Sequence, residues 1–316
     1  MWRGWTGIWV AVSLWCAGAA GCSTDGATKG EVVVPGEQAQ PMRVRVATYN
    51  VHNLFDTVCD TGKCGASDYE TVLNAGDYRQ KVSDVSKGIW TLDADVLLLQ
   101  EIEKESGLQD VQATFAASVY PDYAFGETGA PASVDVAILT RGTITGVERY
   151  RSGFVYTAPD GSTRKLSREL LAAEMTLPNG AELTAFVAHL VSKVSDPGGD
   201  RRLAEAQYIR SVIEAYIQSH PGRLVVFGGD LNDDPGTAPI EVFDRSEVLV
   251  RDTASMALEE ILTWREQAAF DHLYHNAAFD AFRAKTERFC GATVKQGLSS
   301  SDHCGLKSTF YLEDKK

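Results

Sequence analysis

Seven polar residues each follow an apolar stretch that has the length of a buried strand, although they are far apart in the sequence. They are Asn50, Glu101, His189, Asp230, Asn232, Asp302 and His303. Because the ends of neighbouring strands meet at one rim of a sheet, a single fold can bring all seven together. Carboxylates, amides and histidines gathered in this way are the groups of a metal-assisted hydrolase.

Each of these residues, taken alone, also has a structural interpretation. An asparagine after a strand, such as Asn50, is usually a turn residue. Glu101 alone fits a solvated strand end, and Asp230-Leu231-Asn232 fits a loop or a calcium-binding turn. The complete set favours catalysis, because seven independent coincidences at matching strand ends are improbable. The remaining histidines are interpreted as structural or surface residues: His52, His220, His272 and His275.

Apolar periodicity predicts alternating strands and helices that position these residues. Strands are expected at 43–49, 95–99, 134–139, 165–176, 182–189, 224–227, 270–274 and 305–312. Helices are expected at 79–92, 109–119 and 202–220, and Pro159-Asp160-Gly161 indicates a hairpin turn. Because no linker interrupts residues 42–313, we predict one domain in which two packed sheets carry outer helices.

The first 21 residues have the features of an export signal. Residues 5–20 are apolar or small and Arg3 gives a weak positive start, which favours a cleaved signal over a spanning helix. The small residues before Cys22 resemble a bacterial lipoprotein signal, in which Cys22 is lipidated and becomes the N-terminus. Plain secretion and an uncleaved anchor are the alternatives. Residues 22–41 predict a flexible tether, which leaves 42–316 as the catalytic domain.

Four cysteines remain once Cys16 and Cys22 are assigned to the signal region. They are Cys59, Cys64, Cys290 and Cys304. An even count in an oxidising compartment suggests two disulfides, and the simplest pairing joins Cys59 to Cys64 and Cys290 to Cys304. Other pairings stay open, and a zinc site is the other interpretation, although these spacings match no common zinc pattern.

The charge balance limits the classes of partner. A formal net charge of −13 gives the protein no global field that would attract nucleic acid or anionic lipid. A nuclease is not excluded, because bound divalent cations and a few local bases can hold one phosphate group at a time. The bases available near the motifs are Arg168, Lys193, Arg201 and Arg202.

Seven short motifs, in this order, resemble those of the endonuclease/exonuclease/phosphatase superfamily of metal-dependent phosphohydrolases. They are Tyr49-Asn50-Val51, Leu99-Gln100-Glu101, Ser167-Arg168-Glu169, His189-Leu190, Gly229-Asp230-Leu231-Asn232, Asp271-His272 and Ser301-Asp302-His303. Each motif is weak alone, but their order and spacing over residues 43–312 are specific. The resemblance implies a four-layer α/β sandwich of two packed mixed β-sheets flanked by helices, with its site at one edge.

The same resemblance implies how metal and water are held. Glu101 would be the first metal ligand, with Asn50 and Asp302 near it, and Mg²⁺ is expected, with Mn²⁺ or Ca²⁺ as alternatives. Asp230 would accept the proton of the attacking water while Asn232 orients that water. A binding module has no need of such a base, which argues against a surface lipoprotein that binds ligands with a dead site.

The phosphate group would meet the remaining residues. His303 is expected to stabilise charge at phosphorus or to donate a proton, and His189 to be a second donor. Arg168 resembles a phosphate-contacting position, where a guanidinium can bind two oxygens. Asp271 is expected to orient one of the two histidines. Asp135, in an apolar strand, needs a partner, either a site histidine or a structural one.

Substrate and location follow from the resemblance to secreted bacterial nucleases. We expect an extracytoplasmic DNA endonuclease of low sequence specificity, with nucleic acid as substrate. Hydrolysis of a phospholipid head group, as in sphingomyelinases, or of an inositol phosphate by the same mechanism is the alternative. The protein is expected to be a monomer without a protein partner. It would be anchored by its lipid to an outer membrane or cell surface, or else be periplasmic or secreted.

Overall fold

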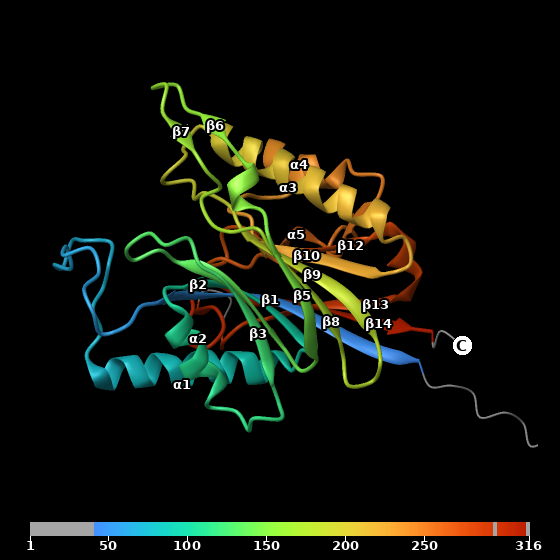
Figure 1. Cartoon of the computed structure of the whole chain (residues 1–316), viewed down its shortest axis with the longest axis horizontal. Coiled ribbons are helices and arrows are strands. Elements are labelled where there is room, and N and C mark those ends of the chain that lie inside the picture. Colours follow the sequence, from blue (N-terminus) through green and yellow to red (C-terminus); the bar gives the residue numbers. More distant parts are fainter. Residues whose placement is uncertain (1–40, 293–295, 314–316) are drawn as a thin grey trace, which may run out of the picture. The chain divides into compact units, whose positions relative to one another are not determined.

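Two six-stranded β-sheets pack face to face, and helices cover their outer faces (Figure 1). The computed structural model describes residues 41–292 and 296–313, so the predicted signal, Cys22 and the tether lie outside the described residues. The arrangement confirms the four-layer sandwich of two mixed sheets flanked by helices. Within the described residues, no helix has both the length and the apolar character needed to cross a bilayer.

The first sheet has the strand order β13-β14-β1-β2-β4-β3. Its strands β1 and β2 are parallel, and the other neighbouring pairs are antiparallel. The bounds are β1 Met42–Leu54, β2 Val96–Ile102, β3 Asp122–Gly126, β4 Asp135–Thr140, β13 Arg283–Phe289 and β14 Gly305–Leu312. The parallel pair directs the carboxyl ends of β1 and β2 toward the same edge, which is where the site forms.

The second sheet repeats this plan with the order β11-β12-β10-β9-β8-β5. Here β9 and β10 are the parallel pair at the centre. The bounds are β5 Thr143–Arg149, β8 Leu171–Thr176, β9 Glu182–His189, β10 Leu224–Asp230, β11 Leu249–Arg251 and β12 Asp271–Asn276. The predicted hairpin is a separate ribbon of β6 Tyr156–Thr157 and β7 Thr163–Arg164, which projects from the sheets (Figure 1).

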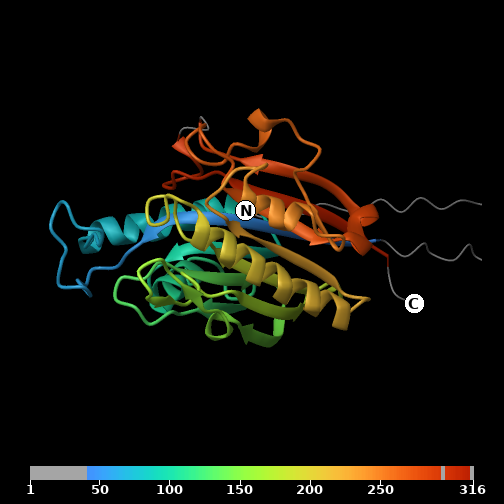
Figure 2. The ribbon, with the colours of Figure 1, turned by 90° about the horizontal axis from the view of Figure 1, so that it is seen from above.

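Helices α1 (Ala75–Leu92) and α2 (Glu105–Gln112) cover the first sheet, and α3 (Asp200–Ser219) and α4 (Ala238–Asp244) cover the second (Figures 1 and 2). Shorter helical turns are α5 Leu258–Ile261, η1 Arg151–Gly153 and η2 Ala277–Phe282. α1 begins four residues before the predicted start, because the Asn74 side chain accepts hydrogen bonds from two backbone N–H groups of its first turn.

The prediction for the second helix was wrong in position. Helix α2 ends at Gln112 and does not continue to residue 119. The Thr114 hydroxyl donates to the Val111 carbonyl, which ends the regular ladder, and Phe115 then packs against Tyr120 outside the helix. The apolar residues that suggested a longer helix are therefore loop residues that cover the first sheet.

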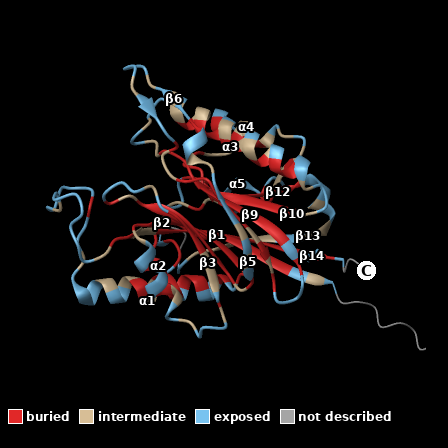
Figure 3. Cartoon of the chain, in the orientation of Figure 1, coloured by how far each residue is buried: buried red, intermediate tan, exposed pale blue. Residues whose placement is uncertain are grey.

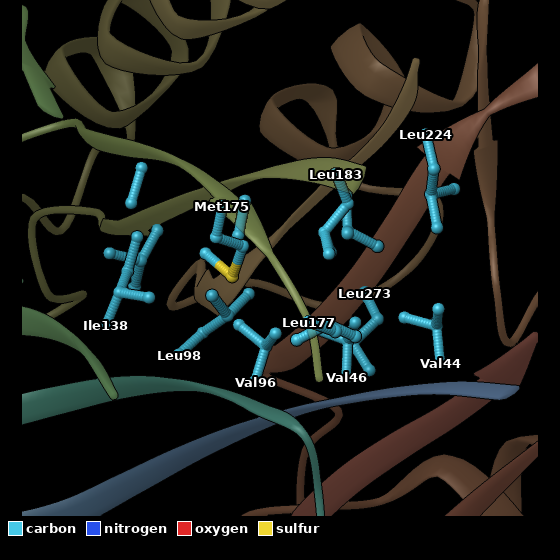
Figure 4. Packing of buried hydrophobic residues seen from close by; sticks show 14 of the residues in the cluster. Val44, Val46, Val96, Leu98, Ile138, Met175, Leu177, Leu183, Leu224 and Leu273 are labelled. Carbon is cyan, nitrogen blue, oxygen red and sulfur yellow. The ribbon is translucent and has the colours of Figure 1, made fainter. Parts of the chain in front are cut away.

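Apolar packing forms three layers that hold the sheets and helices together. Between the sheets, aliphatic side chains such as Leu98, Ile138 and Met175 interlock (Figure 4), and a fully buried leucine contributes about 2 kcal/mol. A second layer lies between the first sheet and α1, and a third between the second sheet and α3. The central strands β1, β2, β4, β9 and β10 are buried on both faces (Figure 3), so both sheets form a rigid base for residues at their edge.

Both predicted disulfides are confirmed. Cys59 is bonded to Cys64, and Cys290 is bonded to Cys304. The second bridge adjoins His303 in sequence and ties the segment before β14 to the end of β13. A zinc site at these cysteines is excluded, because each thiol is used in a disulfide.

Candidate active site

Strand register in the second sheet brings three of the predicted residues side by side. Asp230, at the end of β10, is paired with His189 on β9 and with Asp271 on β12. The approach requires a glycine before Asp230, since Gly229 has a φ of 146° and a Cβ there would lie 1.8 Å from the Ala188 carbonyl oxygen. Only glycine at position 229 lets the end of β10 approach β9 closely enough to place Asp230 beside His189.

Irregular pairing in the first sheet places Asn50 beside Glu101. The register between β1 and β2 shifts after Asn50, and the register between β2 and β4 shifts around Glu101, whose φ is 67°. Such bulges redirect side chains, and the left-handed backbone at a glutamate costs about 1–2 kcal/mol. The Asn50 amide nitrogen donates to Glu101 Oε1 and to Asp230 Oδ2, both at 2.9 Å. Asn50 therefore links the two sheets.

Asn50 makes positioning contacts in this geometry, and its role as a metal ligand stays a prediction. Its Oδ1 accepts the His52 backbone N–H, while Glu101 Oε2 accepts the Asn53 N–H at 2.8 Å. The amide nitrogen of Asn50, not its oxygen, faces the carboxylates of Glu101 and Asp230.

His303 is held by an ion pair inside the site. Its Nδ1 lies 2.7 Å from Asp271 Oδ2, and its Nε2 lies 3.8 Å from Asp230 Oδ2. Burial alone would lower the pKa of His303, but the carboxylates of Asp271, Asp230 and Asp302 outweigh it and raise the pKa to about 10. The Ser301 hydroxyl donates to the Asn50 carbonyl and accepts the His303 N–H, which fixes the segment against β1.

Asp230 lies at the centre of the site and is almost completely buried. Burial raises the pKa of its carboxyl group to about 7, opposed by the His303 cation and supported by Asp271 and Glu101. Its Oδ1 accepts the Asn232 backbone N–H, and the Asn232 side chain donates to the Leu190 carbonyl. A carboxyl group with this pKa is suited to accept and release a proton near neutral pH.

His189 differs from His303 in its charge. Its Nε2 lies 3.6 Å from Asp230 Oδ2, and its Nδ1 has no hydrogen-bond partner among the described residues. Burial lowers the pKa of His189 well below the usual value, and the Arg168 and His303 cations lower it further. The site therefore contains one neutral imidazole and one imidazolium on either side of Asp230.

Asp302 is oriented by two residues that sequence reasoning missed. Its Oδ2 accepts hydrogen bonds from the Trp264 indole and the Arg265 guanidinium, each at 3.0 Å. The other oxygen, Oδ1, is buried without a hydrogen-bond partner among the described residues, 3.6 Å from His52 Nδ1. Trp264 carried no signal in the sequence, since it lies in a loop whose approach to residue 302 is set by the bridge between Trp264 and His303.

These residues form the floor of an open cleft of about 720 Å³. Its walls carry three cationic side chains and three aromatic rings, which are Arg151, Arg168, Lys193, Tyr69, Trp264 and Phe270. Arg168 donates through Nε to the Val134 carbonyl, which places it on the wall predicted to meet phosphate. The Lys193 ammonium lies 4.8 Å from the centre of the Phe270 ring and pairs with Asp233 and Asp234. The cleft thus combines cationic and aromatic side chains on its walls with carboxylates on its floor.

The donor set of the floor suits a hard divalent cation. One ligand atom each from Glu101, His189 and Asp230 lies within 4.8 Å of the other two. The unpartnered Asp302 Oδ1 adds a further buried oxygen. Carboxylate oxygens are the ligands that Mg²⁺, Mn²⁺ and Ca²⁺ prefer, so Glu101 and Asp302 are the residues that would hold such an ion.

Of the two other predicted aspartates, Asp271 orients a histidine of the site and Asp135 does not. Asp271 pairs with His303 and not with its neighbour His272, whose Nε2 contacts the Asp233 carbonyl at 2.9 Å. Asp135 accepts hydrogen bonds from the Thr128 N–H and the Ser133 hydroxyl, and no histidine is among its hydrogen-bond partners in the described residues. Asp135 therefore pairs with structural groups and not with a histidine of the site.

A buried glutamate that sequence reasoning missed joins two walls of the cleft. Glu205, on α3, accepts hydrogen bonds from the Ser167 N–H and hydroxyl and from the Val191 N–H. It thereby ties the loop that carries Arg168 to the segment that follows His189. Its place in the apolar stripe of α3 is the only signal that could have identified it.

Comparison with solved structures finds the same fold. A truncated TDP2 from Caenorhabditis elegans is 20% identical with a TM-score of 0.59, covering 85% of this chain and 97% of that one. D. rerio TDP2 complexed with a single-strand DNA product is 18% identical, with a TM-score of 0.57 and coverages of 85% and 98%. A Bacteroides thetaiotaomicron mannosyl-6-phosphatase is 16% identical, with a TM-score of 0.59 and coverages of 84% and 98%.

Sequence comparison then supplies the family. None of the curated proteins compared with this chain matches it significantly. The model of the Endonuclease/Exonuclease/phosphatase family matches residues 45–248, which is well over half of the chain and includes Asn50, Glu101, His189 and Asp230. The chain therefore belongs to the Endonuclease/Exonuclease/phosphatase family, whose enzymes hydrolyse phosphoester bonds and generally depend on a divalent metal ion.

Proposed function

We propose that this protein is a divalent-metal-dependent phosphodiesterase that acts outside the cytoplasm as a DNA endonuclease. The observation that carries the proposal is the position of Asp230, a buried carboxylate between a neutral and a charged histidine and joined to Glu101 through Asn50. Hydrolysis of a phosphodiester needs a base for water and positive charge near phosphorus, and this arrangement supplies both.

Asp230 accepts the proton of the attacking water in this mechanism. The hydrogen bonds from the Asn50 amide and the Asn232 N–H fix the two carboxylate oxygens of Asp230, so its direction is set before substrate arrives. Asn232, with a φ of 53°, lies directly beside it and orients the water. The pKa of about 7 for Asp230 means that a useful fraction is ionised at neutral pH.

The imidazolium of His303, kept charged by Asp271, stabilises negative charge on the phosphoryl oxygens. His189 is neutral, so one of its ring nitrogens donates a hydrogen bond without adding charge, and the Arg168 guanidinium binds a further oxygen. A divalent ion held by Glu101 and Asp302 would, when bound, neutralise phosphate charge.

Nucleic acid is proposed as the substrate because of what lines the cleft. Arg151, Arg168 and Lys193 supply local positive charge, and the exposed Tyr69 ring supplies a face on which a base stacks. The D. rerio TDP2 structure named above contains a single-strand DNA product in the same fold, which supports the same class of ligand for this chain.

An extracytoplasmic location is proposed from the N-terminus and the disulfides. The sequence before Cys22 predicts export and lipidation, and two disulfides in the catalytic domain suit an oxidising compartment. A Cys22→Ala variant is expected to lose incorporation of a labelled fatty acid in cells. Labelling of Cys22→Ala equal to that of the parent chain would rule out the lipoprotein assignment.

A substrate panel tests the enzymatic proposal. The protein is incubated with plasmid DNA, sphingomyelin and inositol phosphates, in Mg²⁺ and in chelator. We expect DNA cleavage that requires Mg²⁺ and that falls about 10³-fold in His303→Ala but not in His220→Ala, a partly exposed histidine outside the cleft. Hydrolysis of only the lipid or the phosphomonoester would overturn the nuclease assignment and keep the mechanism. The absence of any turnover would favour a binding protein.

A further inference from the structure

A loop between β1 and α1 gathers acidic side chains outside the candidate active site. This acidic loop, residues 56–73, contains the disulfide between Cys59 and Cys64. It lies beyond the N-terminal end of α1 (Figures 1 and 2). One carboxylate oxygen from each of Asp60, Glu70 and Glu103 lies within 4.8 Å of the other two. Three carboxylates at this spacing repel one another unless a cation lies between them.

The only ammonium group that pairs with these acids in the described residues does not neutralise them. Lys104 Nζ lies 2.7 Å from Asp60 and 2.8 Å from Asp56, so one positive charge faces four carboxylates, including Glu70 and Glu103. The backbone fixes the Glu70 carboxylate, which accepts the N–H groups of Asp60 and Thr61. The four carboxylates are therefore held close together although their negative charges repel one another.

Glu103 provides an independent sign of a missing partner. Its side chain is nearly all buried, with 3% of the residue exposed, and it enters the cluster from the end of β2. Its Oε2 accepts the Asp56 N–H, whereas its Oε1 is buried with no hydrogen-bond partner among the described residues. A buried carboxylate oxygen without a donor is costly, and a bound cation would remove that cost.

We propose that Asp60, Glu70 and Glu103 form a second cation site, which binds Ca²⁺ and stabilises the acidic loop. The donor atoms are all oxygen, which Ca²⁺ prefers, and they already lie within 4.8 Å of one another. The nearby sulfurs of Cys59 and Cys64 are bonded to each other, so the site offers no thiolate to zinc. Its carboxylate-rich, partly exposed loop suits the weak affinity of extracellular calcium modules, about 10⁻⁴–10⁻³ M.

The site is connected to the cleft through the neighbouring residue. Tyr69 precedes Glu70, lines the cleft, and packs its ring edge-on against Phe55 at 5.7 Å. Arg168 lines the same cleft, close enough for its positive charge to act on the Tyr69 hydroxyl. Calcium bound at Glu70 therefore fixes Tyr69 and one wall of the substrate cleft, without taking part in the reaction.

The test removes the candidate catalytic cation site first, so that only the acidic loop can respond. In a Glu101→Gln/Asp230→Asn/Asp302→Asn background, the full chain is stripped with chelator and titrated with Ca²⁺ alone by calorimetry. We expect one site, and about tenfold slower trypsin cleavage after the exposed Lys63 at ten times the dissociation constant. Glu70→Gln and Glu103→Gln should abolish both effects, and Asp68→Asn, in the same loop, should keep both.

A charge variant makes the result independent of damage to the fold. Lys104→Gln removes the competing ammonium group and should tighten Ca²⁺ binding about tenfold, whereas a purely structural cluster would give no calcium response in any variant. Unchanged binding in both Glu70→Gln and Glu103→Gln, or no binding by the parent background at 10 mM Ca²⁺ (roughly ten times the weakest affinity expected), would overturn the proposal. Because the background lacks the proposed catalytic groups, these outcomes do not depend on the proposed function.

Discussion

Two buried histidine–aspartate pairs lie at opposite ends of β12, and only one opens on the cleft. At one end Asp271 pairs with His303, 2.7 Å apart, and His303 also faces Asp230 and Asp302. At the other end His275 pairs with Asp252, 2.5 Å apart, with its ring against Phe310 and its Nε2 near Asp280. A short His–Asp contact is therefore no sign of catalysis by itself; access to substrate and neighbouring reactive groups are needed as well.

The largest effect is expected from the pair at the cleft. His303→Ala should lower kcat for phosphodiester hydrolysis about 10³-fold, because the positive charge near phosphorus is removed. The measurement is steady-state turnover at saturating Mg²⁺, with circular dichroism to show that the fold is kept. If the activity of His303→Ala stays within threefold of the parent, the pair of Asp271 and His303 is no more catalytic than the pair of Asp252 and His275.

The pair at the other end should affect stability instead. His275→Ala leaves Asp252 buried with its remaining partner, the Ser308 hydroxyl, and is expected to cost about 3 kcal/mol in the free energy of unfolding. Denaturant unfolding gives the change. Turnover per folded molecule should stay near that of the parent. A large loss of turnover would mean that the buried pair of His275 and Asp252 also contributes to catalysis.

The charge on His303 provides a pH test of the comparison in metal-free protein. A pKa raised to about 10 contributes stability that is fully present below the ordinary histidine value and is lost as pH rises through about 10. Asp271→Asn removes the main partner, so burial should then lower the pKa of His303. Nitrogen NMR of the His303 ring should report imidazolium at pH 8 in the parent and neutral imidazole in Asp271→Asn.

The smallest effect concerns the orientation of Asp302. Trp264→Phe keeps an aromatic ring but removes the indole N–H that donates to Asp302 Oδ2, a loss of about 1 kcal/mol. We expect a rise of roughly fivefold in the Mg²⁺ concentration needed for half-maximal activity. Arg265 retains its contact with the same oxygen, so an effect larger than a hundredfold would show that Trp264 does more than orient the carboxylate.

The strands and helices with strong apolar periodicity were predictable from the sequence. The strands Glu182–His189 and Gly305–Leu312 match the predicted bounds, and α3 matches within two residues. The edge strands β3, β5, β11 and β13 were missed, because they are short or largely exposed and carry no long apolar run. The two-sheet core explains why some strands were predicted and others missed. Central strands are held by burial of apolar side chains, which shows in the sequence, whereas edge strands are held mainly by backbone pairing, which does not.

The residue types of the candidate site were predictable as well, because carboxylates, amides and histidines after buried strands are uncommon without a reason. Their contacts were not. The donation from the Asn50 amide to both Glu101 and Asp230 depends on bulges in β1 and β2, which leave no pattern in the sequence. Trp264 and Tyr69 reach the cleft from loops, and Glu205 holds two of its walls together from α3; the positions of these loops and of the helix are set by packing across the fold.

By itself, the sequence determined which chemical groups are present, in what order, and that Asn50, Glu101, His189 and Asp230 lie in or at the end of buried strands. Asp302 and His303 instead lie in the loop that precedes β14. The tertiary structure decided how they pair. Asp271 and His272 are adjacent in the chain, yet Asp271 contacts His303, 32 residues away, and His272 contacts the Asp233 carbonyl. The physical reason is the alternation of a strand, in which successive side chains point to opposite faces, so that neighbours in sequence are separated and distant residues meet.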